Sequence, residues 1–299
     1  MRNKNKIRQK FDAFKVVTYV LILAWVLSML YLLFFGALNS VKHYFDFELG
    51  NILGLPSKEF GWAFDNYVRV MNEFLVEIKT PQGGVRPVYI EEMFLNTILY
   101  AVAMSLFSIA TQVMTAYAVS KYNFRGSKFI YMVAVIVMLI PIVGALPSQV
   151  EFAHFFNFDN SLIGICIMNC KYPGIYFLVF YAAFKNVSWT YSEAAQIDGA
   201  SHFKIFLQIM LPMVSTTISA VFILYFIQFW NDYQLPMIFL PLKPTVSYGL
   251  YRFQNNVNTT MSTPIKLCAA FVSCIPVIIL FIMFRNKIMG NVAMGGIKG

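Results

Sequence analysis

Long runs without a charged side chain constrain this sequence more than any other feature. Five uncharged, mostly apolar runs cover residues 16–38, 93–120, 129–150, 211–231 and 267–284, the last of which Thr263 and Pro264 could extend. A helix needs about 20 apolar residues to cross a bilayer. A sixth run, residues 161–184, is interrupted by one charge, Lys171. The sequence therefore predicts six membrane-spanning helices.

The composition supports a membrane protein. Of the 299 residues, 59% are hydrophobic and only 12% are charged, whereas about a quarter of the residues in a soluble domain are charged. Too few polar side chains are available to cover a globule of this size, so the apolar surface is expected to face lipid. These proportions exclude a soluble enzyme and a disordered chain.

The placement of the charges predicts the orientation in the membrane. Six basic residues precede the first run, within residues 1–15: Arg2, Lys4, Lys6, Arg8, Lys10 and Lys15. Loop 121–128 carries three basic and no acidic residues, and loop 151–160 carries two acidic and no basic residues. Because basic loops stay in the cytoplasm, both termini, including the tail 285–299, are expected there. The net charge of +9 is thus explained without a nucleic-acid partner.

The first run and the segment after it each allow more than one interpretation. A signal peptide also has a basic flank, but its apolar region spans about 7 to 15 residues, and 23 uncharged residues occur here. A membrane span is therefore expected at 16–38. The next segment, 39–92, has eight acidic and five basic residues and is expected to be an extracytoplasmic cap, in which residues 66–78 could form an amphipathic helix.

The loop at residues 185–212 is the most informative part of the chain. Thr190 followed by Glu193 predicts a capping box that opens a short helix. Gly199 is expected to end this helix, Ser201 to cap a second one, and Pro212 to mark the return into the membrane. Such a pair of helices suits docking to another protein, through small alanines and a carboxylate that can bind an arginine. A solvated connecting loop is the alternative, and these features alone do not decide between the two.

The same loop resembles the EAA signature of permease subunits of bacterial ABC importers. All seven defined positions match: Glu193, Ala194, Ala195, Gly199, Ile209, Leu211 and Pro212. The extended string 193–201, which includes Asp198, is similar to the carbohydrate-uptake subfamily. From about residue 66 onward the chain resembles the second permease of maltose-type systems, although segment 76–92 looks longer than is usual there. The cap is therefore expected to differ.

The resemblance implies an all-α integral membrane protein with the six-helix architecture of type I ABC importer permeases. Its five-helix core would cover residues 93–284, with cytoplasmic coupling helices in loop 185–212. It also implies four kinds of partner: a second permease in a heterodimer, two ATPase subunits, an extracytoplasmic solute-binding protein and the lipid bilayer of the inner membrane. Glu193 would hold the ATPase by its carboxylate, and Ala194 and Ala195 would fit its cleft. Gly199 would permit the turn between the helices.

No catalytic chemistry is expected on this chain. The sequence contains no GxxxxGK[ST] phosphate loop, no HExxH and no GxSxG. The three histidines are scattered and the four cysteines lie in apolar stretches, so neither a metal site nor a disulfide framework is predicted. The chain is therefore expected to be no enzyme and to hold no cofactor, and ATP and Mg²⁺ would be bound by the partner ATPases.

Polar residues within the predicted spans are candidates for a sugar pathway. They are Asn169, Lys171, Tyr172, Gln228 and Asn231, with Gln112 and Ser108 as further examples. Hydrogen bonding between helices is an alternative role for most of them. An ammonium within a span is costly and functional by default. Lys171 is thus expected either to lie at the outer surface or to face the pathway, where it would favour acidic oligosaccharides such as uronic-acid-containing sugars.

Three rival functions remain. An ion-coupled secondary transporter would use carboxylates within the membrane, but the six runs contain no Asp or Glu. A membrane-embedded enzyme would need converging His, Asp or Glu side chains, and none are found at one depth. An importer of peptides or amino acids is disfavoured only by the extended EAA string.

Overall fold

The computed structural model describes residues 13–80, 83–122, 124–140, 144–170, 174–255 and 262–294. Several sequence-based expectations fall outside these ranges. They concern the basic residues before residue 13 and the pathway candidates Lys171 and Tyr172. The chain divides into two compact units, Met1–Met71 with Asn258–Val272, and Asn72–Val257 with Ser273–Gly299.

The first unit contains the long apolar helix α1, Ala13–Ser40. Its stretch Phe14–Ser40 is long and apolar enough to cross a membrane. After α1 the chain turns at residues 41–43, where several hydrogen bonds hold the backbone, and continues into the short helix α2, Tyr44–Glu48. The Asn66 amide donates to the carbonyl oxygens of Ser40 and Lys42, each at 2.9 Å. The buried Lys42 ammonium donates to the Asn51 carbonyl at 2.5 Å, so buried polar groups fix how the cap begins.

Asp46 is a buried acidic residue on α2. Its carboxylate accepts hydrogen bonds from the Asn51 side chain and the Ser57 amide, both at 2.9 Å. Burial would raise the pKa of Asp46, but these bonds and the Lys42 charge outweigh burial and lower the pKa below its ordinary value. The ionised form is therefore the one that the fold stabilises.

The cap contains a β-hairpin that the sequence analysis did not predict. Helix α3, Asp65–Glu73, stops well before residue 78. Strand β1, Leu75–Lys79, pairs antiparallel with β2, Val85–Tyr89. The expected helix over 66–78 is therefore wrong beyond Glu73, where a single hairpin interrupts a chain that is otherwise mainly helical. The physical reason is the period-two pattern of β1, which buries Val76 and Ile78 and exposes the charged residues between them.

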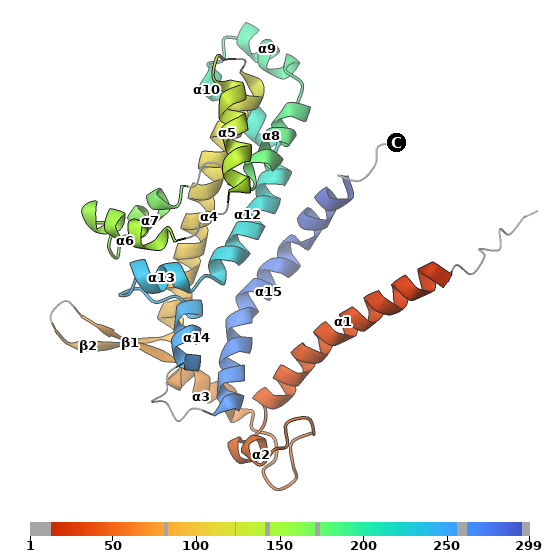
Figure 1. Cartoon of the computed structure of the whole chain (residues 1–299), viewed down its shortest axis with the longest axis vertical. Coiled ribbons are helices and arrows are strands. Elements are labelled where there is room, and N and C mark those ends of the chain that lie inside the picture. Colours follow the sequence, from red (N-terminus) through yellow and green to blue (C-terminus); the bar gives the residue numbers. More distant parts are fainter. Residues whose placement is uncertain are drawn as a thin grey trace, which may run out of the picture. The chain divides into compact units, whose positions relative to one another are not determined.

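Helix α4, Ile90–Lys121, organises the second unit. It packs against α8, Phe177–Asn186, and α12, Ser215–Trp230, and the three helices lie side by side in Figure 1. Their shared core is built from large buried side chains, among them Tyr100, Met104, Phe177, Phe180 and Phe184. This burial of aromatic and aliphatic surface is what holds the three helices together.

The third and fourth expected spans are not continuous helices in the described residues. The third is divided into α5, Ser127–Leu139, and α6, Leu146–Phe155. The fourth is divided into α7, Leu162–Met168, and α8. Gly144 lies between α5 and α6 with a φ of 79°, a left-handed conformation that a continuing helix does not allow.

Three of the described helices are individually long and apolar enough to cross a membrane: Phe14–Ser40, Ile90–Lys121 and Thr263–Phe284. A fourth candidate joins His202–Met213 to Ser215–Trp230 across a bend of 75°. The helix α15, Thr263–Met294, begins at Thr263, so the run expected at 267–284 is extended at its start as the sequence allowed. Two short helices, α13, Gln234–Phe239, and α14, Val246–Asn255, follow α12. A total of six spans remains an expectation.

Candidate coupling loop and polar sites

The loop between α8 and α12 begins with helix α9, Thr190–Ile197. The predicted capping box is wrong, because Thr190 is the first helical residue and its side chain caps nothing. Ser188 explains this arrangement. Its hydroxyl donates to the Thr190 hydroxyl at 3.0 Å and accepts from the Thr190 amide at 3.3 Å. The Glu193 carboxylate is consequently left exposed, and its own amide donates to the Trp189 carbonyl at 3.2 Å.

Gly199 ends α9 as the sequence predicts. Its φ is 77°, and its amide donates to the Gln196 carbonyl at 3.0 Å. The next amide, of Ala200, donates to the Ala195 carbonyl at 2.9 Å. These two crossed bonds are the Schellman motif, which satisfies the last carbonyls of a helix and requires a left-handed residue at the glycine position. The turn is therefore fixed by backbone hydrogen bonds.

A second helical segment runs from α10, His202–Ile205, through a π-helical turn, η1, Phe206–Met210, into α11, Leu211–Met213. Ser201 caps it as predicted, because its hydroxyl accepts from the Lys204 amide at 3.4 Å. Pro212 lacks the amide hydrogen that a continuing α-helix would use. The wider π turn precedes this proline, and the 75° bend into α12 follows it.

Aromatic side chains at the end of α4 hold this loop, and the sequence analysis missed them. The Tyr122 ring meets Trp189 and His202 edge to face, with ring centres 5.7 Å apart in both pairs. The Tyr122 hydroxyl also lies 3.2 Å from Nδ1 of His202. The Lys121 ammonium donates to the Val187 carbonyl. An aromatic next to a basic residue at the cytoplasmic end of a predicted span was the available signal.

The loop has two distinct faces. One face packs into the core of the second unit through Ala195, Ile205, Phe206 and Met210, and Ile209 and Leu211 are half-buried against the same core. Ala195 is only 8% exposed, and it belongs to the core of the second unit. The other face is exposed: Glu193, Ala194, Ile197, Asp198, Phe203 and Pro212. Ile197 is 87% and Phe203 is 70% exposed.

The structure does not gather those pathway candidates that lie within its described residues into one site. Asn169 is buried and its amide donates to the Ile165 carbonyl of its own helical turn at 3.1 Å. Gln228 and Asn231 are exposed at the end of α12, and Asn231 donates to the Ile227 carbonyl at 2.8 Å. Gln112 is buried and donates to the Tyr225 hydroxyl at 2.5 Å. Asn169 thus bonds within its own helical turn, and Gln112 bonds between α4 and α12.

A carboxylate just after α12 was not predicted as a site. Asp232 accepts a 2.8 Å hydrogen bond from the Tyr100 hydroxyl of α4. Its other oxygen accepts from the amides of Gln234 and Leu235 at 3.0 and 3.2 Å, which caps α13. Asp232 therefore joins the end of α12 to the middle of α4. Within the described residues no group of three or more His, Cys, Asp or Glu side chains could hold a metal ion.

Comparison with known proteins identifies the class. Residues 110–293 match the family described as binding-protein-dependent transport system inner membrane component. This match covers more than half of the chain and contains the whole coupling loop, so the chain belongs to this family. The family assigns the chain to the inner membrane, in agreement with the apolar helices.

Individual relatives narrow the class to carbohydrate-type ABC permeases. The chain is 25% identical over 305 residues to the maltodextrin transport system permease MalD of Streptococcus pneumoniae, covering 100% of both chains. It is 26% identical over 252 residues to the trehalose/maltose transport system permease MalG of Thermococcus litoralis, covering 83% of this chain and 85% of that one. These relatives are transport permeases and not enzymes.

A solved structure confirms the fold. It is described as a bacterial ABC transporter involved in the import of the acidic polysaccharide alginate. The superposition gives a TM-score of 0.74 at 22% sequence identity and covers 91% of this chain and 95% of that chain. The mainly helical permease architecture is therefore shared.

Proposed function

We propose that this chain is one of two permease subunits of an ATP-driven, binding-protein-dependent oligosaccharide importer. The relatives that support a sugar cargo carry maltodextrin, trehalose or maltose according to their names. In this proposal six spans cross the membrane, both termini lie in the cytoplasm, and a second permease completes the pathway. A solute-binding protein delivers the sugar from outside, and two ATPase subunits bind ATP and Mg²⁺ inside.

The two-faced loop carries the coupling proposal. The coupling loop exposes two large apolar side chains, Ile197 and Phe203, to 87% and 70%, and in this proposal they form part of the surface that the ATPase covers. Glu193 adds an exposed carboxylate one helical turn from Ile197, and no described residue forms an ion pair with it. An ATPase surface with an apolar cleft and a basic side chain fits this pattern.

The buried face would carry the movement into the membrane helices. Ala195 and Phe206 belong to the same core as α4, α8 and α12. Gly199 fixes the angle between the two helical segments through its paired backbone bonds. A displacement of the exposed face would therefore move the packed helices and not only the loop.

Charge reversal at Glu193 tests the coupling. In the complete importer, Glu193→Lys should abolish copurification of the ATPase subunits and sugar uptake, while membrane insertion of the chain is unchanged. Glu151→Lys is the matched control, because Glu151 is also exposed and lies on α6, outside the loop. Normal assembly and uptake in the Glu193 variant would overturn the coupling proposal.

An acidic cargo is a narrower proposal and depends on Lys171, which lies outside the described residues. An ammonium facing the pathway would attract the carboxylate of a uronic-acid-containing sugar. Exchange of Lys171 for Met should then reduce uptake of acidic oligosaccharides more than uptake of neutral ones. An equal loss for both cargoes, or no loss, would remove the acidic-cargo proposal and leave the importer proposal intact.

A further inference from the structure

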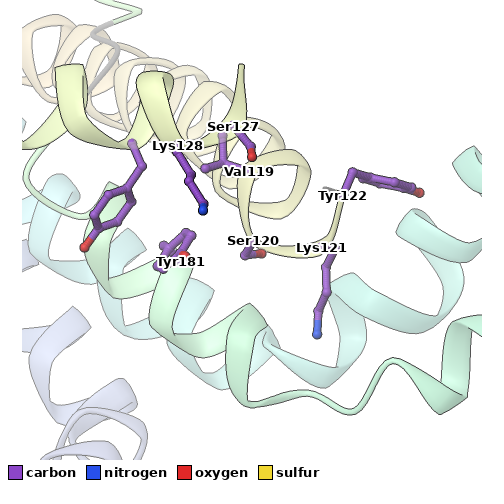
Figure 2. A pocket seen from close by; sticks show the side chains of 8 residues that line it. Val119, Ser120, Lys121, Tyr122, Ser127, Lys128 and Tyr181 are labelled. Atoms are coloured by element: carbon purple, nitrogen blue, oxygen red, sulfur yellow. The ribbon is translucent and has the colours of Figure 1, made fainter. Parts of the chain in front are cut away.

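A cavity of about 280 Å³ lies where the end of α4, the start of α5 and one turn of α8 meet. It is lined by Val119, Ser120, Lys121, Tyr122, Ser127, Lys128, Tyr131 and Tyr181. Figure 2 shows the side chains of Lys128, Ser120 and Tyr181 around one space. A water molecule takes about 30 Å³ in the liquid, so a phosphate group with several waters would fit.

The lining of this cavity suits an anion. It contains two ammonium groups and no carboxylate. The Lys121 ammonium donates to the Val187 carbonyl, whereas Lys128 is exposed and forms no ion pair within the described part of the chain. A third cation, Lys185, lies 5.8 Å from the centre of the Tyr181 ring. The hydroxyl groups of Ser127, Tyr131 and Tyr181 add hydrogen-bond donors.

The cavity lies where apolar helix gives way to polar loop. The uncharged run of α4 ends directly before Lys121, and that of α5 begins directly after Lys128. In a membrane protein this boundary is the level of the lipid headgroups. The basic loop between these lysines is the one that the charge rule assigns to the cytoplasmic side.

An exposed apolar stripe continues from the cavity along α5. Phe129, Met132 and Ile136 are 65%, 53% and 46% exposed. They are spaced by three and four residues, so they lie on one face of the helix. A free phosphate ion would make no contact with this apolar stripe, whereas the acyl chains of a lipid would cover it.

We propose that this cavity binds the phosphate headgroup of an anionic phospholipid of the cytoplasmic leaflet, with Lys128 as the principal contact. The acyl chains lie along the Phe129–Met132–Ile136 stripe. A basic pocket at the cytoplasmic ends of membrane helices is a known physical basis for such recognition. The bound lipid would brace α4 against α8 directly beside Tyr122, which holds the coupling loop.

Native mass spectrometry of the complete importer in a neutral detergent tests this proposal. Phosphatidylglycerol, phosphatidylcholine and inorganic phosphate are titrated separately. The wild-type complex should bind phosphatidylglycerol in preference to phosphatidylcholine, and Lys128→Gln should weaken that binding about fivefold, which is the contribution of one juxtamembrane lysine. Lys128→Arg should retain it. Arg125→Gln is the matched control, because Arg125 lies in the same loop, is exposed and does not line the cavity.

Each other outcome overturns the proposal. Equal phosphatidylglycerol binding by the Lys128→Gln and wild-type complexes would show that Lys128 does not contact the lipid headgroup. Binding of inorganic phosphate with the same dependence on Lys128, together with no preference between the two lipids, would identify a free-anion site. The assay reads bound lipid and not transport, so its result is independent of whether the chain carries sugar.

Discussion

Replacement of Gly199 by alanine is the most direct physical test of the coupling loop. At a φ of 77° the glycine has a left-handed backbone, which costs an L-residue about 1–2 kcal/mol. No other atom lies within 4 Å of a methyl group built at this position. The whole cost is therefore conformational, with no steric clash to add. It should lower the equilibrium constant for the bent loop about 5- to 30-fold.

Hydrogen exchange measures this change directly. The amides of Gly199 and Ala200 donate the two bonds that define the turn, so a peptide covering residues 195–203 should exchange faster in the Gly199→Ala importer by the same factor. ATPase activity stimulated by the loaded binding protein should fall in parallel. Gly126→Ala is the matched control, because Gly126 has a φ of −104° and an added methyl group would lie 3.5 Å from the Phe124 ring, an ordinary contact.

Two results would refute this reasoning. Unchanged exchange in the Gly199→Ala importer would mean that the left-handed turn does not limit the loop. Faster exchange with undiminished ATPase stimulation would mean that the bend is weakened but is not required for coupling. Asn tolerates the left-handed region better than Ala, so Gly199→Asn should recover part of the loss.

Three further predictions concern the parts of the chain that support the loop and the cap. Tyr122→Ala removes ring contacts with Trp189 and His202, each worth about 0.5–1.5 kcal/mol. Because these contacts support the coupling loop, ATP hydrolysis should continue while sugar uptake falls. Tyr122→Phe should behave nearly normally in the same assay. Gly249→Ala would place a methyl group 2.4 Å from the buried Met93 sulfur, and overpacking of this kind costs about 1–3 kcal/mol, so the melting temperature of the purified chain should fall. In the folded cap the pKa of Asp46 lies below its ordinary value of 3.8. Asp46 therefore stabilises the fold fully above pH 3.8, and this stabilisation is lost as the pH falls through the lower pKa of the folded state. Proteolysis within residues 41–57 should therefore accelerate below about pH 4, and Asp46→Asn should weaken this pH dependence.

The sequence was sufficient where one local rule decides the structure. Long charge-free apolar runs predicted α1, α4 and α15, because such a segment has few other stable forms. The glycine joint was predicted because a left-handed residue and a serine cap act within a few residues of the backbone. The third and fourth runs did not form the continuous helices expected, because the absence of charge measures apolarity and does not detect a backbone break such as the one at Gly144.

Competing local signals and tertiary contacts explain the remaining errors. Thr190 and Glu193 have the spacing of a capping box, but Ser188 binds the Thr190 hydroxyl first. The helix period of α3 runs directly into the alternation of β1, and the boundary between them was placed too late. The contacts of Tyr122 and Asp232 join positions distant in sequence, so the residue types at the end of a span can indicate a site there but do not specify its partners.

The division of the coupling loop into buried and exposed side chains also bears on how importers diversify. The residues that anchor the loop to this chain, such as Ala195 and Phe206, are different from those left uncovered, such as Glu193, Ile197 and Phe203. A gene encoding such a permease could therefore acquire compatibility with another nucleotide-hydrolysing subunit through a few outward substitutions. Chimeras that exchange only those outward positions should fold as well as their parent and differ in which energy-supplying subunit they accept.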